Sequence, residues 1–180
     1  MSFADPHANI DVLGLDPGAK VVDVGTGSGF YALLVAKRVG EYGKVYAVDV
    51  QKDLLSRLKT EAARQKLHNI ETVWTDLDQV NSLKFADASM DAAIVSNVLF
   101  MLENRDNCVA EVMRVLKPKA KILFIDWKDR GAGSGLGPHQ DQTLSVAKAT
   151  ALWHAHGARL LREYEAGAHH YGLLFMKNNE

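Results

Sequence analysis

The chain has little of several features that would place it in a specialised class. It contains a single cysteine, Cys108, which excludes an intramolecular disulfide and a cysteine-rich metal site, and we expect no metal. Its 22 acidic and 21 basic residues nearly cancel and form no basic cluster, which makes a nucleic-acid partner unlikely on charge grounds. It shows no signal peptide and no apolar run of membrane length. We therefore expect a cytoplasmic protein with no membrane partner.

The residues that are abundant indicate an ordinary globular chain. A length of 180 residues and a hydrophobic content of 47% suit a single domain spanning residues 1–180. Apolar strands alternate with helical patterns five times, and a terminal hairpin follows. The expected strands are residues 20–24, 44–48, 70–74, 92–95 and 122–126, with the hairpin at 159–164 and 171–176. This alternation predicts an α/β fold with a doubly wound sheet.

A glycine-rich turn follows the first strand. Asp23-Val24-Gly25-Thr26-Gly27-Ser28-Gly29 leads directly into a helical pattern that begins near Phe30. Alternate glycines permit backbone conformations that other residues avoid, and they leave room for a ligand against the chain. The free N–H groups of the following helix point into the same space. The turn therefore predicts a nucleotide site, and the alternative is a tight turn that binds nothing.

The spacing of the glycines distinguishes between nucleotides. A dinucleotide fold has the pattern G-x-G-x-x-G, which would place its third glycine where Phe30 stands. Here the third glycine comes one residue earlier, at Gly29. The sequence also has no Tyr-x-x-x-Lys pair to donate a proton beside a nicotinamide. An NAD-dependent reductase is therefore the least favoured enzyme class.

Two aspartates follow the next two expected strands. Asp49 lies about twenty residues past the turn, where a carboxylate accepts ribose hydroxyls in nucleoside sites of more than one kind. The alternative for Asp49 is an N-cap of the next helix. Asp76 comes just after the third strand, and its alternative is an aspartate that starts a loop. Since ligands bind outside the carboxyl ends of such strands, both carboxylates are expected near the glycine turn.

The pattern Asp23-x-Gly25-x-Gly27-x-Gly29 resembles the cofactor loop of class I S-adenosylmethionine-dependent methyltransferases. Residues 111–118 resemble the helix and turn that precede the fifth strand of that family, in small enzymes similar to quinone-biosynthesis methyltransferases of type 11. The resemblance implies a Rossmann-like, seven-stranded, mostly parallel sheet with a C-terminal antiparallel hairpin strand. It also implies that Asp76 accepts the adenine amino group. The cofactor-binding residues expected on this basis are Asp23, Gly25, Thr26, Gly27, Gly29, Asp49, Val50, Asp76, Leu77 and Asn97.

The resemblance implies methyl transfer, for which the protein mainly aligns donor and acceptor and excludes water. A general base is needed only if the acceptor loses a proton, so the catalytic residues stay unknown. The candidates are His139, His169 and His170, each of which can equally be a partly exposed or core histidine. Trp127, Phe100 and His139 are expected to wall an acceptor pocket. Residues 128–140 would be its mobile loop, and whether residues 1–19 cover the cofactor stays open.

The acceptor itself is not identified by the sequence. A small molecule is expected, because the chain has no appended recognition domain. Ser96-Asn97-Val98 departs from the Asn-Pro-Pro-Tyr signature of enzymes that methylate adenine or glutamine, and the single cysteine disfavours arsenic. The alternatives are a protein or RNA methyltransferase and a non-catalytic S-adenosylmethionine-binding module. The oligomeric state also stays open, since either edge strand of the sheet could pair between subunits.

Overall fold

The structure is a computed structural model that describes residues 6–128 and 142–179. Within these residues the order of elements is α1 (Pro6–Leu13), β1 (Lys20–Val24), α2 (Phe30–Val39), β2 (Lys44–Asp49), α3 (Lys52–Arg64), β3 (Ile70–Trp74), β4 (Met90–Ser96), the 3-10 helix η1 (Leu99–Met101), α4 (Arg105–Val115), β5 (Leu116–Trp127), α5 (Val146–Ala155), β6 (Ala158–Gly167) and β7 (His170–Lys177). In the described part of the chain, no helix is long and apolar enough to cross a membrane.

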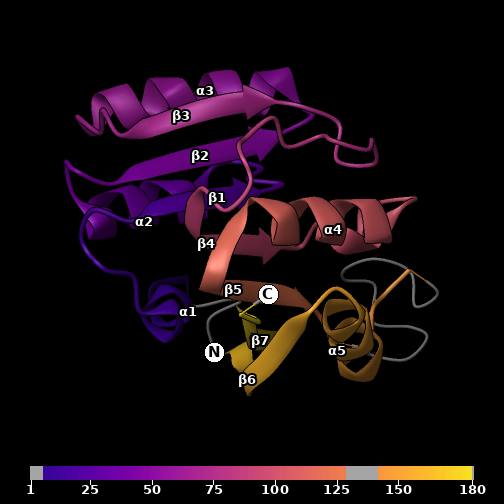
Figure 1. The fold of residues 1–180 in the computed structure, drawn as a ribbon. Coiled ribbons are helices and arrows are strands. Elements are labelled where there is room, and N and C mark those ends of the chain that lie inside the picture. Colours follow the sequence, from indigo (N-terminus) through magenta and orange to yellow (C-terminus); the bar gives the residue numbers. More distant parts are fainter. Residues whose placement is uncertain (1–5, 129–141, 180) are drawn as a thin grey trace.

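The seven strands form one sheet in the order β3-β2-β1-β4-β5-β7-β6 (Figure 1). The first five strands in this order, from β3 to β5, pair in parallel, whereas β7 runs antiparallel to both β5 and β6. The strand order reverses between β1 and β4. From β1 the chain extends the sheet through β2 to β3, and from β4 it extends the other half through β5 to β7 and β6. This confirms the expected Rossmann-like sheet, and it puts the crevice for a ligand at the carboxyl ends of β1 and β4.

Helices cover the sheet on both faces because its strands are apolar on both sides. One buried cluster joins α1, α2 and Leu58 of α3 to one face. A second cluster joins α4 and α5 to the other face, and it contains Trp153, Phe124 and Cys108. Cys108 is 1% exposed, which agrees with its interpretation as a core residue. The two clusters hold the strands rigidly, so the carboxyl ends of the strands keep a fixed spacing.

The junction between α4 and β5 differs from the sequence prediction. The helix was expected to end at Lys117-Pro118 and the strand to begin at Ile122. Instead α4 ends at Val115 and β5 begins at Leu116, so the strand runs through the proline. The pairing with β4 shifts register between Met90 and Ala92, and this irregularity accommodates a residue that cannot donate to the ladder.

Two residues of α4 fasten the irregular segment between β3 and β4. The buried carboxylate of Glu111 accepts the Leu83 N–H at 3.1 Å and pairs with Arg114. Arg114 in turn donates to the carbonyls of Leu83 and Phe85 and to the Asp87 carboxylate. A guanidinium with several fixed donors suits this task, because it satisfies backbone groups that have no partner in a helix or strand.

Candidate active site

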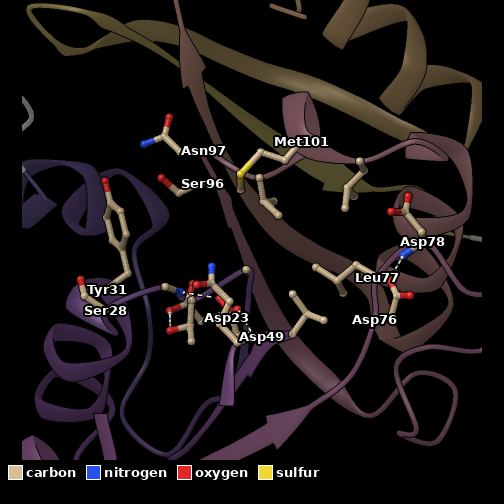
Figure 2. Close-up of a pocket in the computed structure, with 17 residues that line it drawn as sticks. Asp23, Ser28, Tyr31, Asp49, Asp76, Leu77, Asp78, Ser96, Asn97 and Met101 are labelled. Atoms are coloured by element: carbon tan, nitrogen blue, oxygen red, sulfur yellow. Dashed lines mark hydrogen bonds between the residues drawn. The ribbon is translucent and has the colours of Figure 1, made fainter. Parts of the chain in front are cut away.

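A cleft of about 430 Å³ opens at the carboxyl ends of β1, β2 and β4 (Figure 2). This volume lies in the range of about 300–1,000 Å³ that is usual for small-molecule sites. The cleft is lined by Asp23, Gly25, Thr26, Gly27, Ser28, Tyr31, Asp49, Val50, Gln51, Asp76, Leu77, Asp78, Ser96, Asn97, Val98, Met101 and Leu102. The fold therefore brings four separate segments of the chain, 23–31, 49–51, 76–78 and 96–102, to one site.

The three glycines of the turn are needed for different structural reasons. All have positive φ, at 69°, 55° and 78° for Gly25, Gly27 and Gly29. A Cβ on Gly25 would lie 2.5 Å from the Val98 side chain, and one on Gly29 would overlap Leu58. A Cβ on Gly27 would meet no protein atom within 4 Å. Packing thus requires the first and third glycines, whereas the peptide at Gly27 borders the cleft itself.

Two buried carboxylates form the floor of the cleft. Asp23 accepts the Thr26 hydroxyl at 2.6 Å. Asp49 accepts the Gly27 N–H with one oxygen and the Gln51 N–H with the other, both at 2.8 Å. A carboxylate has about four acceptor positions, so Asp49 keeps acceptor capacity for a ligand after making these two bonds. The hydrogen bonds fix both the glycine turn and the direction of the carboxylate.

Burial makes the charge of Asp23 costly. The pKa of Asp23 is raised from 3.8 to about 6, mainly by desolvation and to a smaller extent by the nearby charge of Asp49, against the opposing Thr26 hydrogen bond. A carboxylate with such a pKa gains most from a cation that arrives with a ligand, because the cation compensates the lost hydration.

Charge distinguishes this cleft from a phosphate site. Among the described residues, four aspartates line it, namely Asp23, Asp49, Asp76 and Asp78, and no lysine, arginine or histidine does. Like charges so close favour a cationic ligand and oppose an anionic one. The same part of the chain holds no group of three or more histidine, cysteine, aspartate or glutamate side chains placed to bind a metal.

The two sides of the cleft differ. Figure 2 shows Asp76, Leu77 and Asp78 on one side and Tyr31 and Asn97 on the other. On the first side, Asp76 accepts the Asp78 N–H at 3.0 Å, so the carboxylate shapes its own loop as well as the cleft. The alternative interpretation of Asp76 as a loop-starting residue is therefore correct in part.

The other side of the cleft is uncharged. Asn97 has a φ of 54° and a buried side-chain Oδ1 that no group in the described part of the chain hydrogen-bonds. Tyr31 is held there by the buried Asn9 of α1, whose amide donates to the Tyr31 hydroxyl at 3.0 Å and to the Ala166 carbonyl at 3.2 Å. Asn9 thus ties the N-terminal helix and the β6–β7 hairpin to a residue that lines the cleft.

Nine of the ten residues expected to bind the cofactor line this cleft. The exception is Gly29, which precedes α2 and packs against Leu58. Their contacts with a cofactor stay predictions. The lining residues that are not among those predicted are Ser28, Tyr31, Gln51, Asp78, Ser96, Val98, Met101 and Leu102. Several of these directly follow predicted residues, so adjacency to the strand ends was the available signal.

Among the described residues, those proposed for catalysis and for the acceptor do not line the cleft. His139 and nearly all of the expected mobile loop, from residue 129 onward, fall outside the described residues. His170 is buried and packs on Trp127, with ring centroids 4.4 Å apart. Among described residues, His169, His170, Trp127 and Phe100 are absent from the cleft lining, as are residues 6–19. The roles of these residues therefore stay predictions.

Comparison with known proteins agrees with this site. A family model described as "Methyltransferase domain" matches residues 15–163. The chain is 31% identical over 121 residues to the ubiquinone/menaquinone biosynthesis C-methyltransferase UbiE of Haemophilus ducreyi, covering 66% of this chain and 45% of the relative. It is 29% identical over 110 residues to an arsenite methyltransferase of Halobacterium salinarum, covering 61% and 27%. The chain thus spans less than half the length of each of these curated relatives.

A solved structure matches more completely. The crystal structure of a SAM dependent methyltransferase from Aquifex aeolicus superimposes with a TM-score of 0.86 at 30% identity, covering 97% of this chain and 90% of that one. The resemblance carried by the glycine turn and by residues 111–118 is thereby confirmed. The chain belongs to the methyltransferase domain family.

Proposed function

We propose that the cleft binds S-adenosylmethionine and that the chain transfers its methyl group to a small, uncharged acceptor. The observation that carries the proposal is the lining of the cleft, where four carboxylates gather and, in the described part of the chain, no cationic side chain does. S-adenosylmethionine carries a sulfonium and an ammonium group against one carboxylate, so its net charge suits such a lining. The pyrophosphate of NAD carries negative charge and would be repelled.

The residues present fit the cofactor. The cleft has the volume of a small-molecule site, and the Gly27 peptide borders it without a side chain. Asp49 would accept the ribose hydroxyls, and Asp76 the adenine amino group. Asp23 and the glycine turn would hold the methionine end. When bound, S-adenosylmethionine supplies a methyl group that its sulfonium already activates, and it leaves as S-adenosylhomocysteine.

The protein's own contribution is alignment and exclusion of water. Tyr31, Ser96 and Asn97 form an uncharged side of the cleft that offers hydrogen-bonding groups beside the cofactor site. The described titratable groups that line the cleft include four carboxylates, any of which could accept a proton from an acceptor. This arrangement suits an acceptor that is already electron-rich and needs little activation by a base.

The relatives indicate which small molecules to test first. One acts on a quinone precursor and another on arsenite, according to their names. Trivalent arsenic binds to several thiolates, whereas this chain has only Cys108, whose burial in the core raises its thiol pKa to about 12. A reduced quinone, with an electron-rich ring and hydroxyl groups, is therefore the favoured class of acceptor.

Isothermal titration calorimetry tests the cofactor. We expect S-adenosylhomocysteine to bind with micromolar affinity and NADH to give no heat. Asp49→Ala should abolish the S-adenosylhomocysteine signal, because it removes the carboxylate that the Gly27 and Gln51 N–H groups orient. Binding of NADH alone, or of neither ligand, would contradict the proposal.

An acceptor assay tests the proposed transfer of the methyl group to a small molecule. Purified protein is incubated with methyl-labelled S-adenosylmethionine and either 1,4-dihydroxynaphthalene, kept reduced, or arsenite. We expect label in the organic product from the quinol and none in arsenic species. Labelled arsenic would contradict the acceptor class. Cofactor binding without transfer, even to protein or RNA extracts, would favour the non-catalytic alternative.

A further inference from the structure

We infer that Trp74 is a positioning residue for the nucleoside half of the cofactor, because it fixes the Asp49–Gln51 turn from outside the cleft. The inference rests on the proposed function, since it assigns the cleft to an adenosyl ligand. Trp74 is the last residue of the edge strand β3, where it pairs in parallel register with Asp49 of β2. It does not line the cleft itself.

The contact between Trp74 and the turn is direct. The indole N–H of Trp74 donates to the Val50 carbonyl at 2.8 Å. The next residue, Thr75, donates its backbone N–H to the Asp49 carbonyl at 3.1 Å. Two consecutive carbonyls of the turn are therefore held by two consecutive residues at the end of β3. The Trp74 bond is the one that depends on a side chain.

The turn needs such support because it lies near the exposed edge of the sheet. Val50 lines the cleft but is 52% exposed. On the inner side, Gly27 and Gln51 hold the carboxylate of Asp49. Without the indole bond, the peptide between Val50 and Gln51 would be held only through its N–H, which donates to the Asp49 carboxylate, and its carbonyl side would be less restrained. Rotation there would move the neighbouring carboxylate and the apolar side chain that are expected to contact the ribose and adenine.

The indole is exposed to an unusual degree for a tryptophan, at 56%. Core packing therefore does not account for this side chain, whereas its two specific contacts do. Its ring lies under the ammonium group of Lys52, 4.5 Å from the ring centroid, at the first residue of α3. The cation–π contact restrains the ring on its open side and thereby helps to hold the N–H toward Val50.

Titration calorimetry with S-adenosylhomocysteine and 5′-methylthioadenosine tests the assignment. The second ligand keeps the adenosine part and lacks the amino-acid part. Trp74→Phe removes the donor and keeps an aromatic ring beside Lys52. We expect it to weaken both ligands by the same factor, about three- to tenfold, because the energy of one hydrogen bond sets the upper limit on the loss of positioning. Trp74→Gln, which restores an N–H donor of similar reach, should bind both ligands more tightly than Trp74→Phe does.

Glu71→Gln is the matched control, because Glu71 lies on the same strand, pairs with Lys44 and does not line the cleft. It should leave both affinities unchanged. Affinity of Trp74→Phe equal to that of the wild type would overturn the inference, as would a loss for S-adenosylhomocysteine alone. Equal weakening by Glu71→Gln would also overturn it, since any change in β3 would then suffice. Absence of binding by the wild-type protein would instead overturn the proposed function and this inference together.

Discussion

Asp23 and Asp126 are two buried aspartates near the carboxyl ends of strands in the same sheet. They are 2% and 0% exposed, on β1 and β5 respectively. In both cases desolvation is the largest cause of a raised pKa, to about 6 for Asp23 and to about 7 for Asp126. By burial and chemistry alone, the two positions are nearly equivalent.

Their surroundings differ in one decisive way. Asp23 lines the cleft beside Asp49, where a ligand can bring a compensating cation. Asp126 does not line it, and one of its oxygens accepts the Trp127 N–H at 2.8 Å while the other has no hydrogen-bond partner among the described residues. The charge of Arg105 acts on Asp126 from further away. A buried carboxylate thus indicates a binding site only when it borders a cavity that can admit its counter-charge.

The largest expected effect, which tests the difference between Asp23 and Asp126, is on cofactor binding. Asp23→Asn keeps an oxygen for the Thr26 hydroxyl but removes the charge. We expect the affinity for S-adenosylmethionine to fall about ten- to hundredfold, the usual scale for losing a charged hydrogen bond. Calorimetry measures the loss, and Asp126→Asn serves as the control with unchanged affinity. Equal losses of affinity in Asp23→Asn and Asp126→Asn would contradict the difference drawn between the two aspartates.

The same Asp126→Asn variant should have a smaller effect, on the stability of the folded protein. Because the folded-state pKa of Asp126 lies above its ordinary value of 3.8, the folded protein binds the proton more tightly than the unfolded chain. Its contribution to stability is therefore present at low pH and is lost as pH rises through about 4 to 7. We expect Asp126→Asn to raise the free energy of unfolding by about 1–2 kcal/mol at pH 8.

Urea unfolding between pH 4 and pH 8 measures this difference, with the Asp126→Asn protein matched to the wild type at each pH. The stabilising effect should nearly vanish near pH 4, where both folded proteins are uncharged at this position. If Asp126→Asn were less stable than the wild type at pH 8, the charged Asp126 would have a partner in the protein that compensates its lost hydration.

Local parts of the site could be predicted from the sequence. The glycine turn lies within seven consecutive residues, so the strand, the spacing of Gly25, Gly27 and Gly29, and Asp23 are read together. Asp49 follows from the length of one crossover unit. The sheet follows from the alternation of strands and helices. These features depend on short stretches of chain, and most of the expected cofactor residues line the cleft for that reason.

The remaining features depend on contacts between distant segments. Tyr31 is held by Asn9, which also reaches Ala166, 157 residues further along the chain. Trp74 acts on a turn 24 residues earlier through a single indole bond. No periodicity or spacing encodes these contacts, because helix packing and strand order must exist before they form. The histidines were chosen for their chemistry alone, and the structure places none of the described ones in the cleft.

The most direct test of the account is calorimetric titration of S-adenosylmethionine at pH 6 in phosphate and in bis-Tris, buffers with different heats of ionisation. Near its pKa, Asp23 is about half protonated, and a bound cation should drive it to the charged form. We predict release of about half a proton per ligand by the wild type and by Asp126→Asn, and none by Asp23→Asn. Binding by the wild type without proton release would contradict the claim that the cleft is built for a cation.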